Sequence, residues 1–174
     1  MKYFVKFFVI TFLLFAFNNA FAENKIIYVD MDKVLNESKV GKSVQKTLTN
    51  IHKKNLDLFK KTEDTLKKEE KDLLSKKNVM KKEEFAEKIQ ALRKKAQDYQ
   101  NERKKRLDEI TSKRANARTE ILKTLQSILA KYADQNQISL ILDKKEIIIG
   151  KKDLEATDEI IVELDKKLSS IKLN

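Results

Sequence analysis

Apolar residues recur at helical spacing along the middle of the chain. From Val44 to Leu73, and again from Phe85 to Tyr132, they follow one another mostly in steps of three, four or seven positions. The outgoing seam consists of Val44, Leu48, Ile51, Leu58, Leu66 and Leu73. An average step of about 3.5 residues is typical of the narrow apolar seam of a coiled coil. Residues 42–149 contain no Gly and no Pro, the residues that disfavour a helix interior most. The pattern therefore predicts long helices whose outer faces are charged.

This seam is interrupted at residues 75–82, which read Ser-Lys-Lys-Asn-Val-Met-Lys-Lys. Ser and Asn favour turns, and Glu83 and Glu84 suit the first turn of a new helix because a helix N-terminus is partially positive. We expect an antiparallel helical hairpin with its tip near residues 76–82. One continuous helix is the alternative.

The seam is also thin. Asn55, Thr62 and Glu69 interrupt it on the outgoing side, and Arg103 and Arg106 interrupt it on the returning side. A seam with such gaps should pack loosely, which suits a binder of variable partners. Apolar residues off the seam either thicken the packing or offer dispersed contacts to a partner. They are Leu56, Phe59, Leu74, Val79, Met80 and Leu107.

Both ends of the chain have a different pattern. Residues 25–30 and 138–143 are short β-type runs with apolar residues on both faces, and residues 146–149 form a third such run. Thr157 and the two acidic residues after it are typical of a helix start. The apolar face of that helix would consist of Ile160, Ile161, Leu164, Leu168 and Ile171.

Together these elements predict a mostly helical α+β fold, in which a long antiparallel hairpin projects from a small β-containing body. The hairpin would comprise residues 44–132, and the body residues 23–43 and 133–174. A body of that size buries only a marginal core, so we expect it to oligomerise. The candidate contact residues are Ile26, Ile27, Val29, Leu140, Leu142 and Ile148.

Residues 1–22 have the pattern of a cleavable signal peptide. A basic start precedes an apolar run over residues 7–17, and small residues at positions 20 and 22 predict cleavage between Ala22 and Glu23. The apolar run is too short to span a bilayer of about 30 Å as a helix. A retained membrane anchor is the alternative. The mature chain would start at Glu23 and lie outside the cytoplasm.

Composition excludes several kinds of site. The chain has no Cys and only two Gly, so it can form no disulfide, zinc–thiolate site, iron–sulfur cluster or glycine-rich phosphate loop. The single histidine, His52, has no visible catalytic partner. Asp30, Asp32 and Asp143 could form a carboxylate cluster for a divalent metal, but capping and turn roles account for all three. We expect no enzyme activity and no cofactor.

Positive charge is concentrated in the predicted arm. The chain has 38 Lys and Arg against 27 Asp and Glu, and residues 51–118 hold 22 of the basic and 13 of the acidic groups. Such a field attracts nucleic acid, an anionic membrane surface or acidic unfolded protein. Nucleic acid is the weakest candidate, because no groove-reading motif is present. Lys outnumbers Arg 33 to 5, so compositional bias is the alternative explanation.

The order of these features resembles the Skp (OmpH-like) family of periplasmic chaperones. The resemblance rests on the opening strand of residues 25–30, Gly41-Lys42 at the start of the hairpin, the strand of residues 138–143, and the Thr-Asp-Glu helix start at Thr157. It covers nearly all of the mature chain, although the arms match only in character. It implies a periplasmic homotrimer whose three arms enclose a cavity.

That resemblance also implies a function. The family binds unfolded outer-membrane β-barrel proteins and shields them from aggregation without ATP, and its arm tips are linked to anionic lipid and lipopolysaccharide. A structural coiled-coil protein of the envelope, or a binder of anionic polymer or lipopolysaccharide, are the alternatives. The candidate residues for contact with clients or anions are Lys76, Lys77, Met80, Lys81, Lys82, Arg103 and Arg106.

Overall fold

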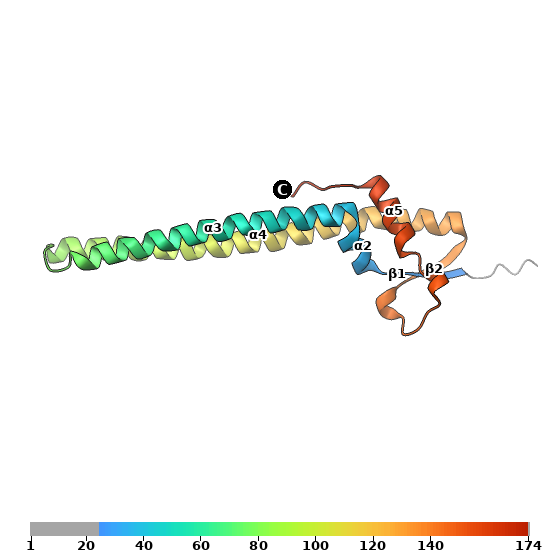
Figure 1. Cartoon of the computed structure of the whole chain (residues 1–174), viewed down its shortest axis with the longest axis horizontal. Coiled ribbons are helices and arrows are strands. Elements are labelled where there is room, and N and C mark those ends of the chain that lie inside the picture. Colours follow the sequence, from blue (N-terminus) through green and yellow to red (C-terminus); the bar gives the residue numbers. More distant parts are fainter. Residues whose placement is uncertain (1–24, 174) are drawn as a thin grey trace, which may run out of the picture.

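The structure is a computed structural model of the chain and describes residues 25–173. A long two-helix arm projects from a small body that holds two strands and the shorter helices (Figure 1). The predicted signal peptide, with its cleavage site between Ala22 and Glu23, lies outside the described residues. In chain order the elements are β1 (Lys25–Val29), α2 (Met31–Glu37), α3 (Lys39–Ser75), α4 (Lys82–Asn136), β2 (Ile138–Asp143), the short 3-10 helices η1 (Lys144–Glu146) and η2 (Lys152–Leu154), and α5 (Thr157–Lys167).

The arm consists of α3 and α4, which lie antiparallel and side by side (Figure 1). α3 has 37 residues, so it gives the arm a length of roughly 55 Å at about 1.5 Å per residue. The chain turns at residues 76–81, where the N–H of Lys76 donates to carbonyls of the last turn of α3. α4 then begins with Glu83 and Glu84 in its first turn. The predicted hairpin is confirmed, and the continuous helix is excluded.

A tight bend joins the body to the arm. Ser38 ends α2 and begins α3, because its N–H donates to the carbonyl of Val34 while its Oγ accepts from the N–H of Gly41 at 3.2 Å. A Cβ on Gly41 would stand 2.0 Å from the carbonyl oxygen of Leu35. Glycine at this position therefore permits a close approach of α2 and α3 that a larger residue would prevent.

β1 and β2 form a parallel two-stranded sheet, in which Ile26 pairs with Leu140 and Tyr28 pairs with Leu142. Parallel strands need a long crossover connection, and the whole arm supplies it here. On the other side of β1, the N–H of Ala156 donates to the carbonyl of Tyr28 at 3.0 Å. β1 is thus covered on both sides, whereas β2 pairs with no further strand among the described residues.

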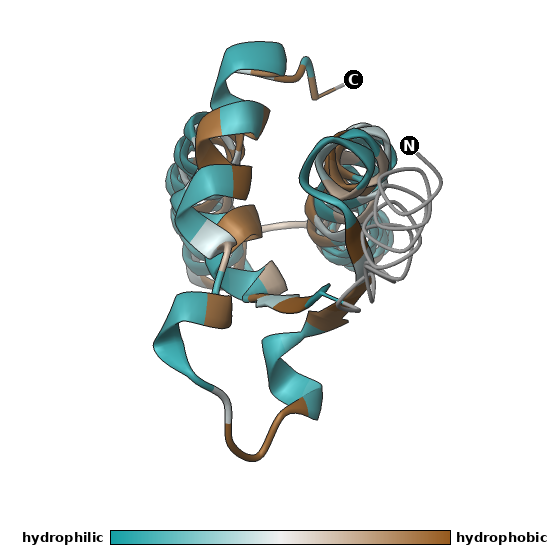
Figure 2. Cartoon of the chain, turned by 90° about the vertical axis from the view of Figure 1, so that its right-hand side faces the viewer, coloured by the Kyte–Doolittle hydropathy of each residue, from teal (hydrophilic) through white to brown (hydrophobic). Residues whose placement is uncertain are grey.

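The described residues form no strand over residues 146–149, so the prediction of a third strand was wrong for the single chain. The carboxylate of Asp143 accepts from the N–H of Lys145 at 3.2 Å and turns the chain into η1. The segment between η1 and η2 then projects from the body as an apolar loop (Figure 2), and its Ile148 and Ile149 are exposed. A strand must pair its backbone groups with a neighbour, and the described residues offer this segment none.

The core lies where the arm meets the body. Val29 of β1, Val34 of α2, Leu125 of α4, and Ile160 and Leu164 of α5 are completely buried. α5 packs against both α2 and α4, so the root of the arm is covered by further elements. The outer arm consists of α3 and α4 alone (Figure 1).

α5 begins at Thr157 as predicted, but it ends at Lys167, earlier than expected. Leu168 already has an extended backbone, with φ −145°. Leu168 and Ile171 therefore do not continue the apolar helix face. They belong to residues 168–173, hereafter the tail. The tail runs back from α5 toward the arm (Figure 1), and its apolar side chains are partly buried against the core, next to α4.

Candidate functional site

Lysines surround the tip of the arm. Lys76, Lys77, Lys81 and Lys82 are exposed, and none of them forms an ion pair with another described residue. Met80 is half-buried and lines a shallow cavity of about 290 Å³ between α3 and α4 just behind the tip. The tip thus combines positive charge with a small apolar recess.

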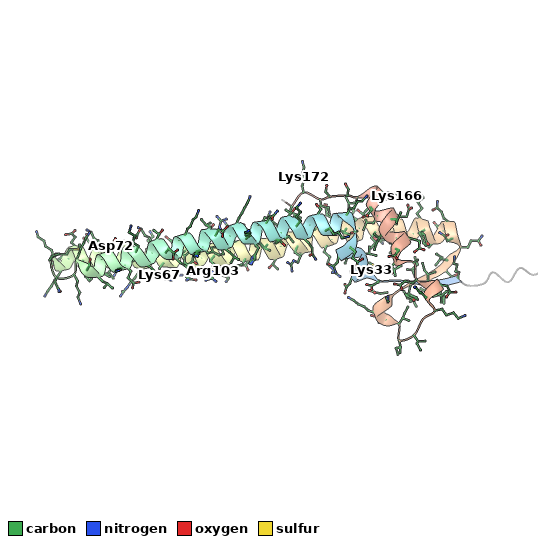
Figure 3. All side chains as sticks on the ribbon, viewed as in Figure 1. Lys33, Lys67, Asp72, Arg103, Lys166 and Lys172 are labelled. Atoms are coloured by element: carbon green, nitrogen blue, oxygen red, sulfur yellow. The ribbon has the colours of Figure 1, made fainter. Side chains whose placement is uncertain are left out.

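Apolar side chains are dispersed along the surface of the arm. Val79 at the tip is 85% exposed, and the others are between 40% and 54% exposed. They alternate with charged side chains, which project along the whole length of the arm (Figure 3). Each offers one small contact, and together they form no continuous groove. The exposed set is Leu56, Leu58, Leu74, Val79 and Leu107.

The seam of α3 runs one position away from where the sequence pattern placed it at the middle of the arm. Leu58 was expected in the seam and is 41% exposed, whereas Phe59 is 5% exposed. Phe59, Leu66 and Leu73 are seven residues apart and occupy the same helix face, so the correct register was present in the spacing. The apolar residues predicted to lie off the seam were expected either to thicken the packing between the helices or to offer contacts to a partner. Phe59 is buried and contributes to the packing.

Aromatic and charged side chains bridge the two helices at this level. The hydroxyl of Tyr99 donates to Glu63 Oε1 at 2.5 Å, and its ring meets Phe59 edge-on with a centroid distance of 6.2 Å. The guanidinium of Arg103 lies 5.7 Å from the centre of the Phe59 ring and 3.7 Å from Glu63 Oε1. Burial and the hydrogen bond to Glu63 raise the pKa of Tyr99, so the phenol stays protonated and donates.

Nearer the root, a polar residue occupies the seam itself. Asn55 is 6% exposed, and its Oδ1 accepts from Arg106 Nη1 at 3.4 Å. Arg106 Nε is buried and lies 2.7 Å from Glu102 Oε1, without the geometry of a hydrogen bond. Contacts across the arm therefore engage both arginines proposed to meet clients. These residues form the polar layer, which consists of Asn55, Phe59, Glu63, Tyr99, Arg103 and Arg106.

The residues proposed for oligomerisation fall into two groups. Ile27 and Val29 are buried in the chain's own core. Ile26 and Leu140 are paired neighbours in the sheet and are 44% and 47% exposed, and Ile148 is fully exposed. Leu142, the remaining candidate, is half-buried on the same strand as Leu140. The exposed group lies beside the open edge of β2, where a second chain could pair with it.

The carboxylates considered as metal ligands have structural contacts. Asp30 Oδ1 accepts from the N–H of Lys33 at 2.9 Å and caps α2, and Asp32 forms an ion pair with Lys145 at 2.7 Å. The hydrogen bond from Lys145 lowers the pKa of Asp32. Asp143 caps η1. Within residues 25–173, no group of three or more acidic or histidine side chains could hold a metal ion.

His52 is exposed on α3, as expected for a histidine on a solvated helix face. In the same described part of the chain, no helix combines the length and the apolar character needed to cross a bilayer. What the molecule presents is an extended surface: a basic tip, dispersed apolar side chains, and an open sheet edge.

A family model described as outer membrane protein (OmpH-like) matches residues 25–164. The chain belongs to this OmpH-like family. The match includes the whole arm and the body as far as the middle of α5, so the mostly helical fold with a small sheet is that of the family.

Among solved structures, the chain is similar to a proposed OmpH-like outer membrane chaperone from Caulobacter crescentus CB15. The TM-score is 0.82 at 19% sequence identity, and the similarity covers 86% of this chain and 89% of that chain. At this identity the similarity establishes the fold alone. No curated protein sequence matches the chain.

Sequence reasoning identified the basic tip but missed the polar layer as a unit. The heptad spacing of Phe59, Leu66 and Leu73 was a usable signal for its position. The hydrogen bond between Tyr99 and Glu63 depends on the relative register of two helices, which one sequence does not reveal. The tail was missed because Leu168 and Ile171 continue the helical spacing of α5.

Proposed function

We propose that this OmpH-like protein is an ATP-independent periplasmic chaperone that holds unfolded outer-membrane proteins and prevents their aggregation. The observation that carries the proposal is the outer arm: a long, basic hairpin with an interrupted seam and dispersed exposed apolar side chains. Family membership and the described role of the similar Caulobacter crescentus protein support it. A chaperone of this kind needs no active site and no cofactor.

Charge would act first, during encounter. Residues 51–118 carry 22 basic and 13 acidic groups, and the tip lysines have no ion-pair partner within residues 25–173. A positive arm accelerates association with acidic unfolded chains at low ionic strength. Salt screens this attraction over a Debye length of about 10 Å at 0.1 M. Anionic lipid or lipopolysaccharide would be attracted to the same tip.

Apolar contacts would act second, during holding. The exposed side chains of the arm, such as Leu56, Leu74 and Val79, are distributed along its length, so each would add a small contact without selecting a sequence. The client's exposed apolar surface disappears when it folds into the membrane. Release then follows without a chemical step.

Several arms around one client would multiply these weak contacts. The open edge of β2, with Ile26 and Leu140 on one exposed face and Ile148 on the loop beside it, is suited to contact between copies of the body. We propose a homotrimer held by the bodies, with the arms around a common space. Export by a signal peptide over residues 1–22 would place this trimer in the periplasm.

The test is native mass spectrometry on residues 23–174, alone and after dilution of a urea-unfolded outer-membrane barrel into the protein. We expect a trimer that acquires one barrel and suppresses light scattering by the barrel. A stable particle that leaves the barrel to aggregate would favour a structural envelope protein. Binding to polyanions or lipopolysaccharide together with no binding to unfolded barrels would favour an anion binder instead.

A further inference from the structure

Two polar contacts tie the C-terminal end of the described chain to α4. Lys167, the last residue of α5, donates from Nζ to Ser127 Oγ at 2.7 Å. Lys113 Nζ donates to the carbonyl oxygen of Leu173 at 3.1 Å. The first contact lies at the end of α5 and the second at the end of the tail, so the tail bridges two separate points of one long helix.

The length of the tail matches the distance between these two points. Ser127 and Lys113 are about 14 residues apart on α4, which corresponds to about 21 Å at 1.5 Å per residue. The chain from residue 167 to residue 173 reaches at most about 22 Å when it is extended. The tail therefore spans the two contacts with little slack, apart from the reach of the two lysine side chains.

Apolar side chains add to the polar contacts. Leu168, Ile171 and Leu173 are half-buried and pack against the core, whereas Lys172 is exposed and points away from the ribbon (Figure 3). The packing is incomplete, because a cavity of about 380 Å³ remains between the tail and α4. The tail can therefore leave α4 without removing any completely buried side chain from the core.

The tail lies where the arm emerges from the body. α5 and residues 127–136 of α4 line one cavity, and the tail and residues 113–120 of α4 line another. On the other helix of the arm, Val44 and Leu48 belong to the same core as Ala117. Farther toward the tip, α3 and α4 have only each other (Figure 1). The tail thus extends the covered part of α4 from Ser127 to Lys113.

We propose that the tail is a releasable strap that ties the base of the arm to the body. While the strap is attached, the arm bends relative to α5 only beyond Lys113, and after release it bends from Ser127 outward. A single partly buried hydrogen bond contributes little net stability, so the strap can detach, and its tether returns it to α4. Under the proposed chaperone function, on which this consequence rests, release would let the arms separate further around a large client.

The test measures the position of the arm relative to α5. The chain has no cysteine, so Asn101→Cys and Glu159→Cys place two spin labels at exposed sites, one on the outer arm and one on α5. Glu159 shares a cavity with residues 127–136 of α4, so the labels should lie roughly 45 Å apart. Pulsed electron paramagnetic resonance gives the distribution of this distance. We expect deletion of residues 168–174 to widen the distribution roughly twofold.

Point variants separate the contacts of the tail from its presence. Ile171→Ser combined with Leu173→Ser keeps the chain length and should widen the distribution nearly as much as the deletion does. Lys172→Ser is the matched control, because that side chain points into solvent, and it should leave the width unchanged. Equal widths in the wild type, the deletion variant and the double variant would overturn the proposal. Equal widening by Lys172→Ser would also overturn it, because the inward contacts would then not be responsible.

The spin-label measurement needs no client, so it is independent of the proposed function. For the consequence, we expect the deletion to raise capture of a large unfolded barrel relative to a small one roughly threefold. An unchanged ratio together with a widened distribution would contradict the consequence but not the strap. If the distribution widens and no form captures an unfolded barrel, the chaperone proposal fails while the strap stands.

Discussion

The root of the arm and its outer half are built from the same two helices but differ in what covers them. At the root, Val44 and Leu48 of α3 and Ile121 and Leu125 of α4 are buried together with α2, α5 and the sheet. Farther out, α3 and α4 have only each other. A two-helix layer buries too little apolar surface to be rigid alone, so the comparison separates a stable base from a compliant arm.

The seam between α3 and α4 also differs between the root and the outer arm. At the root its positions are apolar, whereas outward from residue 55 it includes Asn55, Thr62 and Glu69. The polar layer replaces apolar packing by hydrogen bonds and ion pairs, which contribute little net stability when they are partly exposed. Under the proposed holding function, low stability would let the arm adapt to different clients, whereas it would be harmful at the root.

The largest expected effect tests the root. Leu125→Ala removes a completely buried side chain, and we expect the free energy of unfolding to fall by about 3 kcal/mol. Leu74→Ala on the outer arm, where the side chain is 54% exposed, should cost less than about 1 kcal/mol. Urea denaturation followed by circular dichroism measures both. Equal losses in the two variants would remove the proposed difference between root and outer arm.

The next test reduces the difference between root and outer arm by making the outer arm more stable. Asn55→Leu combined with Arg106→Leu would replace the root-side part of the polar layer by apolar packing. Asn55 is buried and Arg106 is partly exposed, so apolar side chains of similar volume should pack at least as well here, and we expect the outer arm to gain about 1 kcal/mol. Hydrogen exchange of the amides in residues 50–110 should slow accordingly, and the stiffer arm should suppress barrel aggregation less well.

Lys53→Leu combined with Lys105→Leu is the matched control for that variant. Both lysines are exposed and lie outside the seam, so the same gain in apolar character should leave amide exchange nearly unchanged. Faster exchange in the Asn55/Arg106 variant would mean that the polar layer stabilises the arm, contrary to this account.

A third test compares charge at the two ends of the molecule. Reversal of Lys76, Lys77, Lys81 and Lys82 to Glu should slow capture of an unfolded acidic barrel roughly tenfold at low salt, with little effect at high salt. Stopped-flow fluorescence measures the rate. The control carries the same reversal at the root of the arm and in the body, far from the tip, and therefore the same net charge. It is Lys123, Lys131, Lys151 and Lys152 to Glu, and equal slowing there would assign the effect to total charge rather than to the tip.

Much of this architecture follows from local pattern. Helical spacing, the break at residues 76–81 and the Thr157 helix start depend on neighbouring residues, and the structure has all three. The strand predicted over residues 146–149 does not form, because β-type residues only favour a strand, and a strand forms only when it can pair with a neighbour. Ile148 and Ile149 are exposed, and neither strand of the described chain pairs with them.

The candidate surfaces were less predictable. Exposure of the tip lysines follows from their place at a turn. Engagement of Arg103 and Arg106 across the arm, by contrast, depends on which residues of α3 face them. The pattern also could not separate Ile27, which the chain buries itself, from Ile26, which it leaves exposed, because both are apolar residues of one strand.

The smallest expected effect concerns acid stability of the body. Hydrogen bonds from Lys144 at 2.9 Å and from Thr157 at 3.0 Å hold the pKa of Glu155 below its ordinary value of 4.5. The folded state thus binds this proton more weakly than the unfolded state does. The stabilisation is fully present above about pH 4.5 and is lost as the pH falls through the folded pKa.

Glu155→Gln keeps the shape and the acceptor oxygen but removes this titration. We therefore expect the variant to lose less free energy of unfolding than the wild type when the pH is lowered from 5 to 3, as measured by urea denaturation at each pH. Glu70→Gln on the outer arm, where the side chain is exposed, should follow the wild type. Glu155 precedes Ala156, whose N–H donates to the carbonyl of Tyr28 in β1, so its ion pair lies next to a contact that holds the body together. If the free energy of unfolding fell equally with pH in all three proteins, the Lys144–Glu155 ion pair would contribute nothing to the stability of the body.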